Sequence, residues 1–272
     1  MAMRAVTTAL LVAGSVLAAG VAEVKGAQEW WKEPPRETGL DQRTVDPAGR
    51  FAARTKWDDG YIEVRAAATA DPRVAINEAQ AISMALRAAR VLAYEKLLET
   101  VEGVQIDGTT IVRNAMIENS VVKATVTGRI RGARIVDESH SRKPDGSIWA
   151  EVTLGLPLYG QAGLTPAVAP WTAARPVDPY RPNPRFAVND AYTGLIVEAS
   201  DTNFSPALTP RILQAEDGAL VYGPQSLADP ASQMLGPVAY AGSLAEGRQS
   251  PRAGANPLIV RAIVAGGGRQ GD

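Results

Sequence analysis

The stretch YIEVRAAATADPRVAINEAQAISMALRAARVLAYEKLLETV, residues 61–101, decides the fold. In its first ten residues, Ile62, Val64 and Ala66 alternate with polar or charged side chains. Such alternation is typical of a strand that buries one face and exposes the other. The sequence therefore predicts a half-buried strand at the start of this stretch.

A long helix is expected directly after this strand. Asp71-Pro72 combines an N-cap residue with a proline at the first helical position. From there to Gly103, where glycine supplies a stop signal, apolar residues recur at helical spacing. These residues are Ile76, Ala79, Ile82, Leu86, Ala89, Ala93, Leu97 and Val101. The helix would be roughly 40 Å long, and its many alanines favour close packing against a sheet.

Antiparallel strands are expected after the helix. Val126, Ile130 and Val136 alternate with Arg129 and Arg131, which predicts a long strand with both arginines on one face. Two interpretations of these arginines are open. They could bind an anionic envelope polymer such as lipopolysaccharide or peptidoglycan, or they could lie on a solvated face with salt bridges.

A turn and a partner strand complete this unit. Residues 144–146, Pro-Asp-Gly, form a turn signal because proline sets φ and glycine accepts a positive φ. Apolar residues then alternate from Ile148 to Leu156. The sequence therefore predicts an α+β domain over residues 57–159, with one long helix packed on a small antiparallel sheet.

The N-terminus has the pattern of a secretory signal peptide. Arg4 is followed by an apolar or small-residue run, and cleavage is expected after Ala22 or as late as Gly26. A single membrane span is the alternative, but the run is short and poor in leucine and isoleucine. The chain has no cysteine, so a covalent lipid anchor is excluded. We expect signal peptide 1–22 and a periplasmic protein, peripherally associated with the outer membrane.

Residues 23–56 show neither helical nor strand periodicity and are expected to be a flexible N-terminal segment. Trp30 and Trp31 are its large apolar side chains. One interpretation is that they cover an exposed edge of the core. The other is that they contact a partner or a membrane interface, where tryptophan is favoured.

The C-terminal part divides into three expected segments. Residues 160–189 are rich in proline and predict a stiff, extended linker. Residues 190–265 predict a small second α+β domain, with strands near 193–200 and 256–267, a hairpin around Glu216–Gly218 and a short helix. Residues 266–272 are expected to be a disordered tail.

The residues give no sign of an enzyme, and we expect no catalytic residue, cofactor or metal. His140 is the one histidine, and with Ser139, Ser141 and Asp137 it sits at an expected hairpin end rather than in a triad assembled from distant segments. Residues 58–60, Asp-Asp-Gly, lack the further oxygen ligands of a calcium loop. The net charge of −1 argues against a nucleic-acid partner.

Residues 57–159 resemble a known family. The features that carry the resemblance are the strand IEVRAAATA, the helix AISMALRAARVLAYEKL, Val104 with the glycine before it, Gly128 in VTGRI and the strand SIWAEVTLGLPLYG. They are similar to the small outer-membrane lipoproteins named for a twenty-kilodalton antigen, the Lpp-type family, and to the N-terminal domain of flagellar assembly protein T. Gly20 stands where the lipoprotein pattern has its lipidated cysteine, so in this respect the chain is closer to the soluble flagellar relatives.

The resemblance implies a non-enzymatic structural or assembly protein of the cell envelope, with a ring or disk of the flagellar motor as its place. Self-association and contacts with other envelope or flagellar proteins are the expected partnerships. The alternative is a soluble periplasmic binding module for a small ligand or envelope polymer. The residues expected to contact partners are Trp30, Trp31, Arg129 and Arg131.

Overall fold

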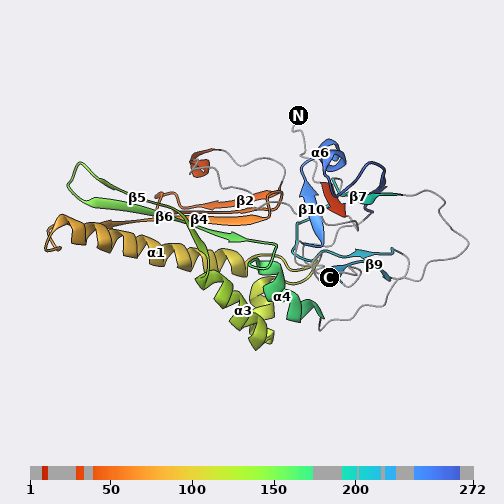
Figure 1. The fold of residues 1–272 in the computed structure, drawn as a ribbon, viewed down its shortest axis with the longest axis horizontal. Coiled ribbons are helices and arrows are strands. Elements are labelled where there is room, and N and C mark those ends of the chain that lie inside the picture. Colours follow the sequence, from red (N-terminus) through yellow and green to blue (C-terminus); the bar gives the residue numbers. More distant parts are fainter. Residues whose placement is uncertain are drawn as a thin grey trace, which may run out of the picture.

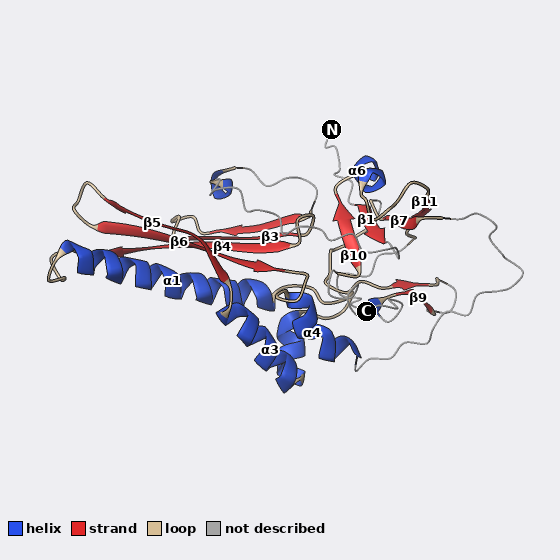
Figure 2. Ribbon diagram, viewed as in Figure 1, coloured by secondary structure: helices blue, strands red, loops and turns tan. Residues whose placement is uncertain are grey.

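The computed structural model describes residues 8–11, 29–33, 39–173, 192–200, 202–215, 218–224 and 236–263. A long helix lies along one face of a five-stranded sheet, and a smaller sheet lies beyond one end of this layer pair (Figures 1 and 2). Helices and antiparallel strands are combined in both parts of the chain. The predicted α+β class is confirmed.

The first unit contains the larger sheet and most of the helices. Its five strands follow the order β2-β3-β4-β6-β5, and every neighbouring pair is antiparallel. Its elements are η1 (Trp30–Lys32), β2 (Asp41–Val45), β3 (Phe51–Lys56), β4 (Tyr61–Ala70), α1 (Glu78–Glu102), α2 (Val112–Glu118), α3 (Ser120–Arg131), β5 (Arg134–Arg142), β6 (Ile148–Pro157) and α4 (Leu164–Ala173).

The second unit combines the C-terminal elements with a strand from the N-terminus. Its elements are β1 (Thr8–Leu11), β7 (Gly194–Glu198), β8 (Ile212–Leu213), β9 (Leu220–Tyr222), β10 (Val238–Ala241), α6 (Leu244–Gln249) and β11 (Pro257–Arg261). The four-stranded sheet has the order β10-β1-β7-β11, and β8 pairs with β9. The two expected strands and the pairing of the hairpin strands are present. The short helix expected over residues 238–249 is confirmed only in its second half, because residues 238–241 form β10 and α6 begins at Leu244. The expected tail, residues 266–272, lies outside the described residues.

Strand β1 belongs to the segment that the sequence predicts to be a signal peptide. It lies inside the sheet and pairs antiparallel with both β10 and β7. The structure is therefore that of the chain with residues 1–22 retained.

Helix α1 packs on the sheet through a row of small side chains. The buried positions are Ala81, Ala85, Ala89, Ala93, Leu97 and Val101. They are spaced by four residues, and alanine allows the helix axis to come close to the strands below it. The helix begins after Asn77, whose side chain accepts a hydrogen bond from the Gln80 backbone N–H. The predicted start at Asp71 is thus wrong, and Ile76 and Ala79, which were expected on the buried face, are exposed.

The predicted long strand around Val126 is wrong, because α3 occupies these residues. Val122, Val126 and Ile130 are buried at intervals of four, which is a helical spacing. The side chain of Asn119 accepts hydrogen bonds from the first helical N–H groups. Strand β5 begins only at Arg134.

Residues 23–56 do not form a uniformly unstructured segment, since β2 and β3 lie within them. The two strands form a hairpin around Asp46 and Gly49, where the Gly49 φ of 68° suits a residue without a Cβ. The face that carries the buried Ala53 also carries Gln42, Thr44 and Thr55, so no apolar alternation marks the two strands in the sequence.

The expected extended linker at 160–189 also needs correction. Its residues Leu164–Ala173 form α4, which buries Leu164, Ala167, Val168 and Trp171 in the main core. Pro166 lies in the first turn, where proline is tolerated. Residues 174–191 lie outside the described residues.

The two units share one hydrophobic core. The Trp57 ring meets the Tyr240 ring edge to face, with centroids 5.7 Å apart. The backbone N–H groups of Leu208 and Thr209 donate to the carbonyl oxygens of Gln105 and Ile106, at 2.9 and 2.8 Å. The second unit is therefore packed directly on the first.

Candidate functional site

Two tryptophans from η1 cover part of the sheet face opposite α1. The Arg54 guanidinium carbon lies 4.3 Å from the Trp30 ring centre, and that of Arg65 lies 4.3 Å from the Trp31 ring centre. Arginine stacked on an aromatic face is attracted by the ring electrons. The two strands β3 and β4 thus position the arginines on which the tryptophans lie.

Carboxylates on neighbouring strands hold these arginines. Arg54 forms an ion pair with Glu63, N–O 2.5 Å, and Arg65 forms one with Glu151 on β6. Arg43 on β2 donates to the backbone carbonyl of Trp30 at 2.7 Å. The charged groups of this face are therefore engaged with the protein itself.

The two tryptophans differ in their accessibility. Trp30 is only 2% exposed, so its ring covers the sheet, as the first interpretation of the sequence expects. Trp31 is half-buried and remains partly accessible beside Arg65. Only Trp31 of this pair presents a substantial surface to a partner.

Arg129 and Arg131 do not share a strand face. Both lie in the last turn of α3, two positions apart, and helical residues at that spacing point in different directions. Their charge near the helix C-terminus complements the helix dipole. The expected paired basic face is absent from this helix.

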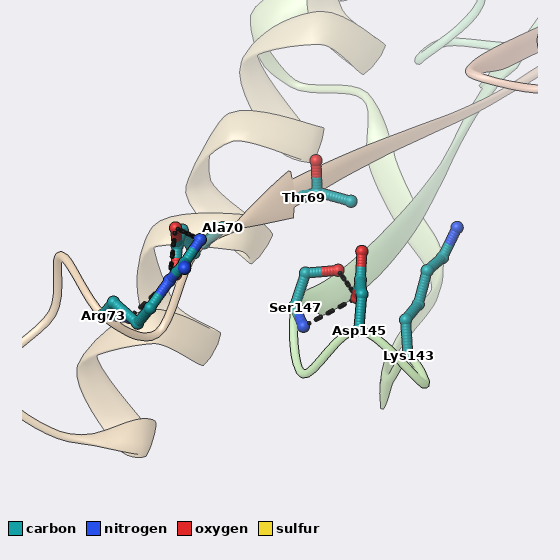
Figure 3. Close-up of a pocket in the computed structure, with 7 residues that line it drawn as sticks. Thr69, Ala70, Arg73, Lys143, Asp145 and Ser147 are labelled. Carbon is teal, nitrogen blue, oxygen red and sulfur yellow. Dashed lines mark hydrogen bonds and ion pairs between the residues drawn. The ribbon is translucent and has the colours of Figure 1, made fainter.

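A shallow pocket of about 350 Å³ lies at the end of the sheet between β4 and the β5–β6 turn. Figure 3 shows Arg73 on one side of it and Lys143, Asp145 and Ser147 on the other. Arg73 is paired with Asp71, and Asp145 accepts hydrogen bonds from Ser147. Because these groups are satisfied within their own loops, the pocket does not converge on a ligand.

Two further properties concern only the described part of the chain. Within it, no group of three or more histidine, aspartate or glutamate residues is placed to hold a metal ion. None of its helices combines the length and the apolar character needed to cross a bilayer.

Exposed apolar side chains mark the helical layer. On α1, Met84 is 44% exposed, Val91 62% and Leu98 36%. Ile117 on α2 and Val121 on α3 are 77% and 56% exposed. These exposed positions are not among the partner-contact residues expected from the sequence, although Met84, Val91 and Leu98 recur there at a seven-residue spacing. Large exposed apolar surfaces are typical of protein–protein contact sites. On α1 the exposed apolar side chains alternate with charged ones, among them Arg87, Arg90 and Glu95.

The ion pair on the sheet face makes a pH prediction for Glu151. Burial raises the pKa of Glu151, but hydrogen bonds from Arg65 and Trp149 outweigh it and leave this pKa below its ordinary value. The ionised carboxylate therefore stabilises the fold fully above the unfolded pKa of about 4.3, and this contribution is lost as pH falls through the lower folded value. We expect the unfolding free energy of Glu151→Gln to fall less steeply than that of the wild type between about pH 5 and pH 3.

Urea unfolding at a series of pH values measures this dependence. Glu33→Gln removes a carboxylate from an exposed position directly after η1 and serves as the comparison. Wild-type and Glu151→Gln curves that stay parallel across this range would contradict the prediction.

The described residues form a two-unit α+β protein with exposed apolar side chains on α1, α2 and α3. Residues 194–272 match a family model described as the second domain of Treponema pallidum Tp0624. The second unit is thus similar to a domain of a bacterial protein. The comparison with curated proteins gives no match.

Proposed function

We propose that the protein is a non-enzymatic structural or assembly component of the bacterial cell envelope that acts through protein–protein contacts in the periplasm. The observation that carries this proposal is the set of exposed apolar side chains on α1, α2 and α3. A protein exposes apolar groups at a cost in solubility, and burial against another protein removes that cost.

Two further observations support the proposal. The polar groups of the sheet face and of the shallow pocket are paired within the protein, so neither place offers a set of free polar groups to a ligand. The match of the second unit to a domain of a treponemal protein is consistent with a bacterial role.

The narrower part of the proposal places the protein in a ring or disk of the flagellar motor. It rests on the resemblance of residues 57–159 to the Lpp-type lipoproteins and to the N-terminal domain of flagellar assembly protein T. Partners in this role would be further copies of the chain and other motor proteins.

Deletion of the gene in its host tests both parts. We expect reduced swimming, restored by the wild-type gene, and recovery of a tagged protein in the periplasmic fraction. Normal swimming together with a leaky envelope would contradict the flagellar part and leave the envelope part standing. Normal swimming, an intact envelope and a cytoplasmic protein would contradict the whole proposal.

A further inference from the structure

Three exposed apolar side chains form a row along the solvent side of α1. Met84, Val91 and Leu98 are seven residues apart, so they lie almost in line, with a drift of about 20° per seven residues. At the middle of the helix, the buried Ala89 and Ala93 lie on the side opposite Val91, and towards the two ends the buried row comes closer to Met84 and to Leu98. The three residues therefore form the ridge that α1 presents to solvent.

Two unpaired charges flank the centre of this ridge. Arg87 lies four residues before Val91 and Glu95 lies four residues after it. Neither forms an ion pair within the described part of the chain. The other charged residues of α1 all do, in the pairs Glu78–Arg142, Arg90–Glu138, Lys96–Glu99 and Glu102–Arg113.

The ridge is complementary to itself in the reversed direction. When a second α1 is laid antiparallel with Val91 against Val91, Met84 of each copy meets Leu98 of the other. The same alignment places Arg87 of each copy opposite Glu95 of the other, so two unpaired charges of opposite sign meet twice. A parallel alignment in register would instead bring Arg87 to the level of Arg87, where like charges repel.

We infer that the protein forms a two-fold symmetric dimer in which the α1 ridges pack antiparallel about Val91. A two-fold contact uses the same patch on both copies and requires this self-complementarity. Apolar residues repeated every seven positions suit helices that cross at a small angle.

The ends of α1 extend the contact. Val74 and Ile76, just before the helix, are exposed. At the other end, the ion pair between Arg113 and Glu102 holds α2 beside the C-terminus of α1. Antiparallel packing brings the N-terminus of α1 in one copy to the C-terminus of α1 in the other copy, near the exposed Ile117 of that other copy.

The dimer deepens the proposed assembly role, on which it rests, by naming a second copy as the first partner. The two can fail separately. A monomeric protein whose deletion still impairs the envelope would overturn the dimer and leave the proposed function in place.

Light scattering of the purified protein during size exclusion tests the inference first. We expect the mass of two copies for the wild type and of one copy for Val91→Glu. Val45→Glu, at an exposed valine of β2, is the matched control and should retain the wild-type mass. A wild-type monomer, or a Val91→Glu variant that remains dimeric, would overturn the inference.

A charge exchange tests the predicted ion pairs. Arg87→Glu and Glu95→Arg should each raise the dissociation constant by about tenfold, because each places like charges together twice in the dimer. The double variant restores opposite charges and should return close to the wild-type value. Failure of the double variant to recover would contradict the antiparallel alignment, and circular dichroism of each variant establishes that it is folded.

Disulfide formation tests the direction of packing, and the absence of native cysteine makes the result unambiguous. Met84→Cys and Leu98→Cys proteins, mixed and oxidised, should form a cross-linked pair. Either variant oxidised alone should not. Cross-linking of Met84→Cys with itself would show a parallel pair and overturn the inference.

Discussion

Deletion of residues 1–22 is expected to disrupt the four-stranded sheet of the second unit. Strand β1 supplies four residue pairs to β10 and four to β7, and no direct pairing joins β10 to β7. Backbone hydrogen bonds contribute about 0.5–1.5 kcal/mol each, so the loss is on the order of 5 kcal/mol. We expect faster amide exchange in both β7 and β10.

Hydrogen exchange and urea unfolding of the truncated and full-length chains measure this effect. Deletion of residues 2–6 leaves β1 intact and is the matched control. Leu10→Pro is a second test, because proline cannot donate to the ladder of an interior strand. Unchanged exchange in β7 and β10 after the longer deletion would contradict a structural role for β1.

The outcome also bears on export. If residues 1–22 are removed as a signal peptide, the mature chain has two facing strand edges, on β7 and on β10. Such edges readily accept another strand. A truncated chain that is unstable alone but ordered in its host would indicate that another segment takes the position of β1.

Trp57→Ala is expected to destabilise both units together. Trp57 is 2% exposed and contacts Tyr240 across the boundary between the units. Truncation of a buried tryptophan costs about 3–5 kcal/mol, including the cavity that remains. Because the core is continuous, we expect a single unfolding transition that moves to lower urea concentration.

Circular dichroism and the fluorescence of the remaining tryptophans should report the same midpoint for this variant. Trp57→Phe is the conservative comparison and should cost less, since the indole N–H of Trp57 makes no hydrogen bond that the replacement would break. Trp31→Ala removes a half-buried ring from the far sheet face. Two separate transitions in Trp57→Ala, with only one of them shifted, would show that the units unfold independently.

The sequence was most informative where the apolar residues fit only one periodicity, either that of a helix or that of a strand. The helix ending at Gly103 and the strands around Val64 and Val152 follow directly from their patterns. Val126 and Ile130 fit both a strand alternation and a four-residue helical spacing, and the cap at Asn119 was the signal that separates them. Residues 164–171 also have apolar residues at helical spacing, but the proline content of this region is equally typical of a linker.

Other features depend on contacts that no local pattern contains. The β2–β3 hairpin lacks apolar alternation because Gln42, Thr44 and Thr55 share the face of the buried Ala53, and the contacts of its other face come from η1 and β4. The partnership of Arg65 with Glu151 requires the register of β4 against β6. The apolar run that contains β1 has the composition of a signal peptide, and only its pairing shows that it can also be a strand.

The backbone hydrogen bonds from Leu208 and Thr209 to residues 105 and 106 have a mechanical consequence. Together with the ion pair between Arg211 and Asp107, N–O 3.6 Å, they join the C-terminal unit to the loop that follows α1. Force applied to either unit is transmitted directly to the other through this junction, as it would not be through a flexible linker. The two units would therefore behave as one rigid body. In an assembly of copies, the orientation of one unit would fix the orientation of the other unit of the same chain, and with it the spacing between neighbouring copies.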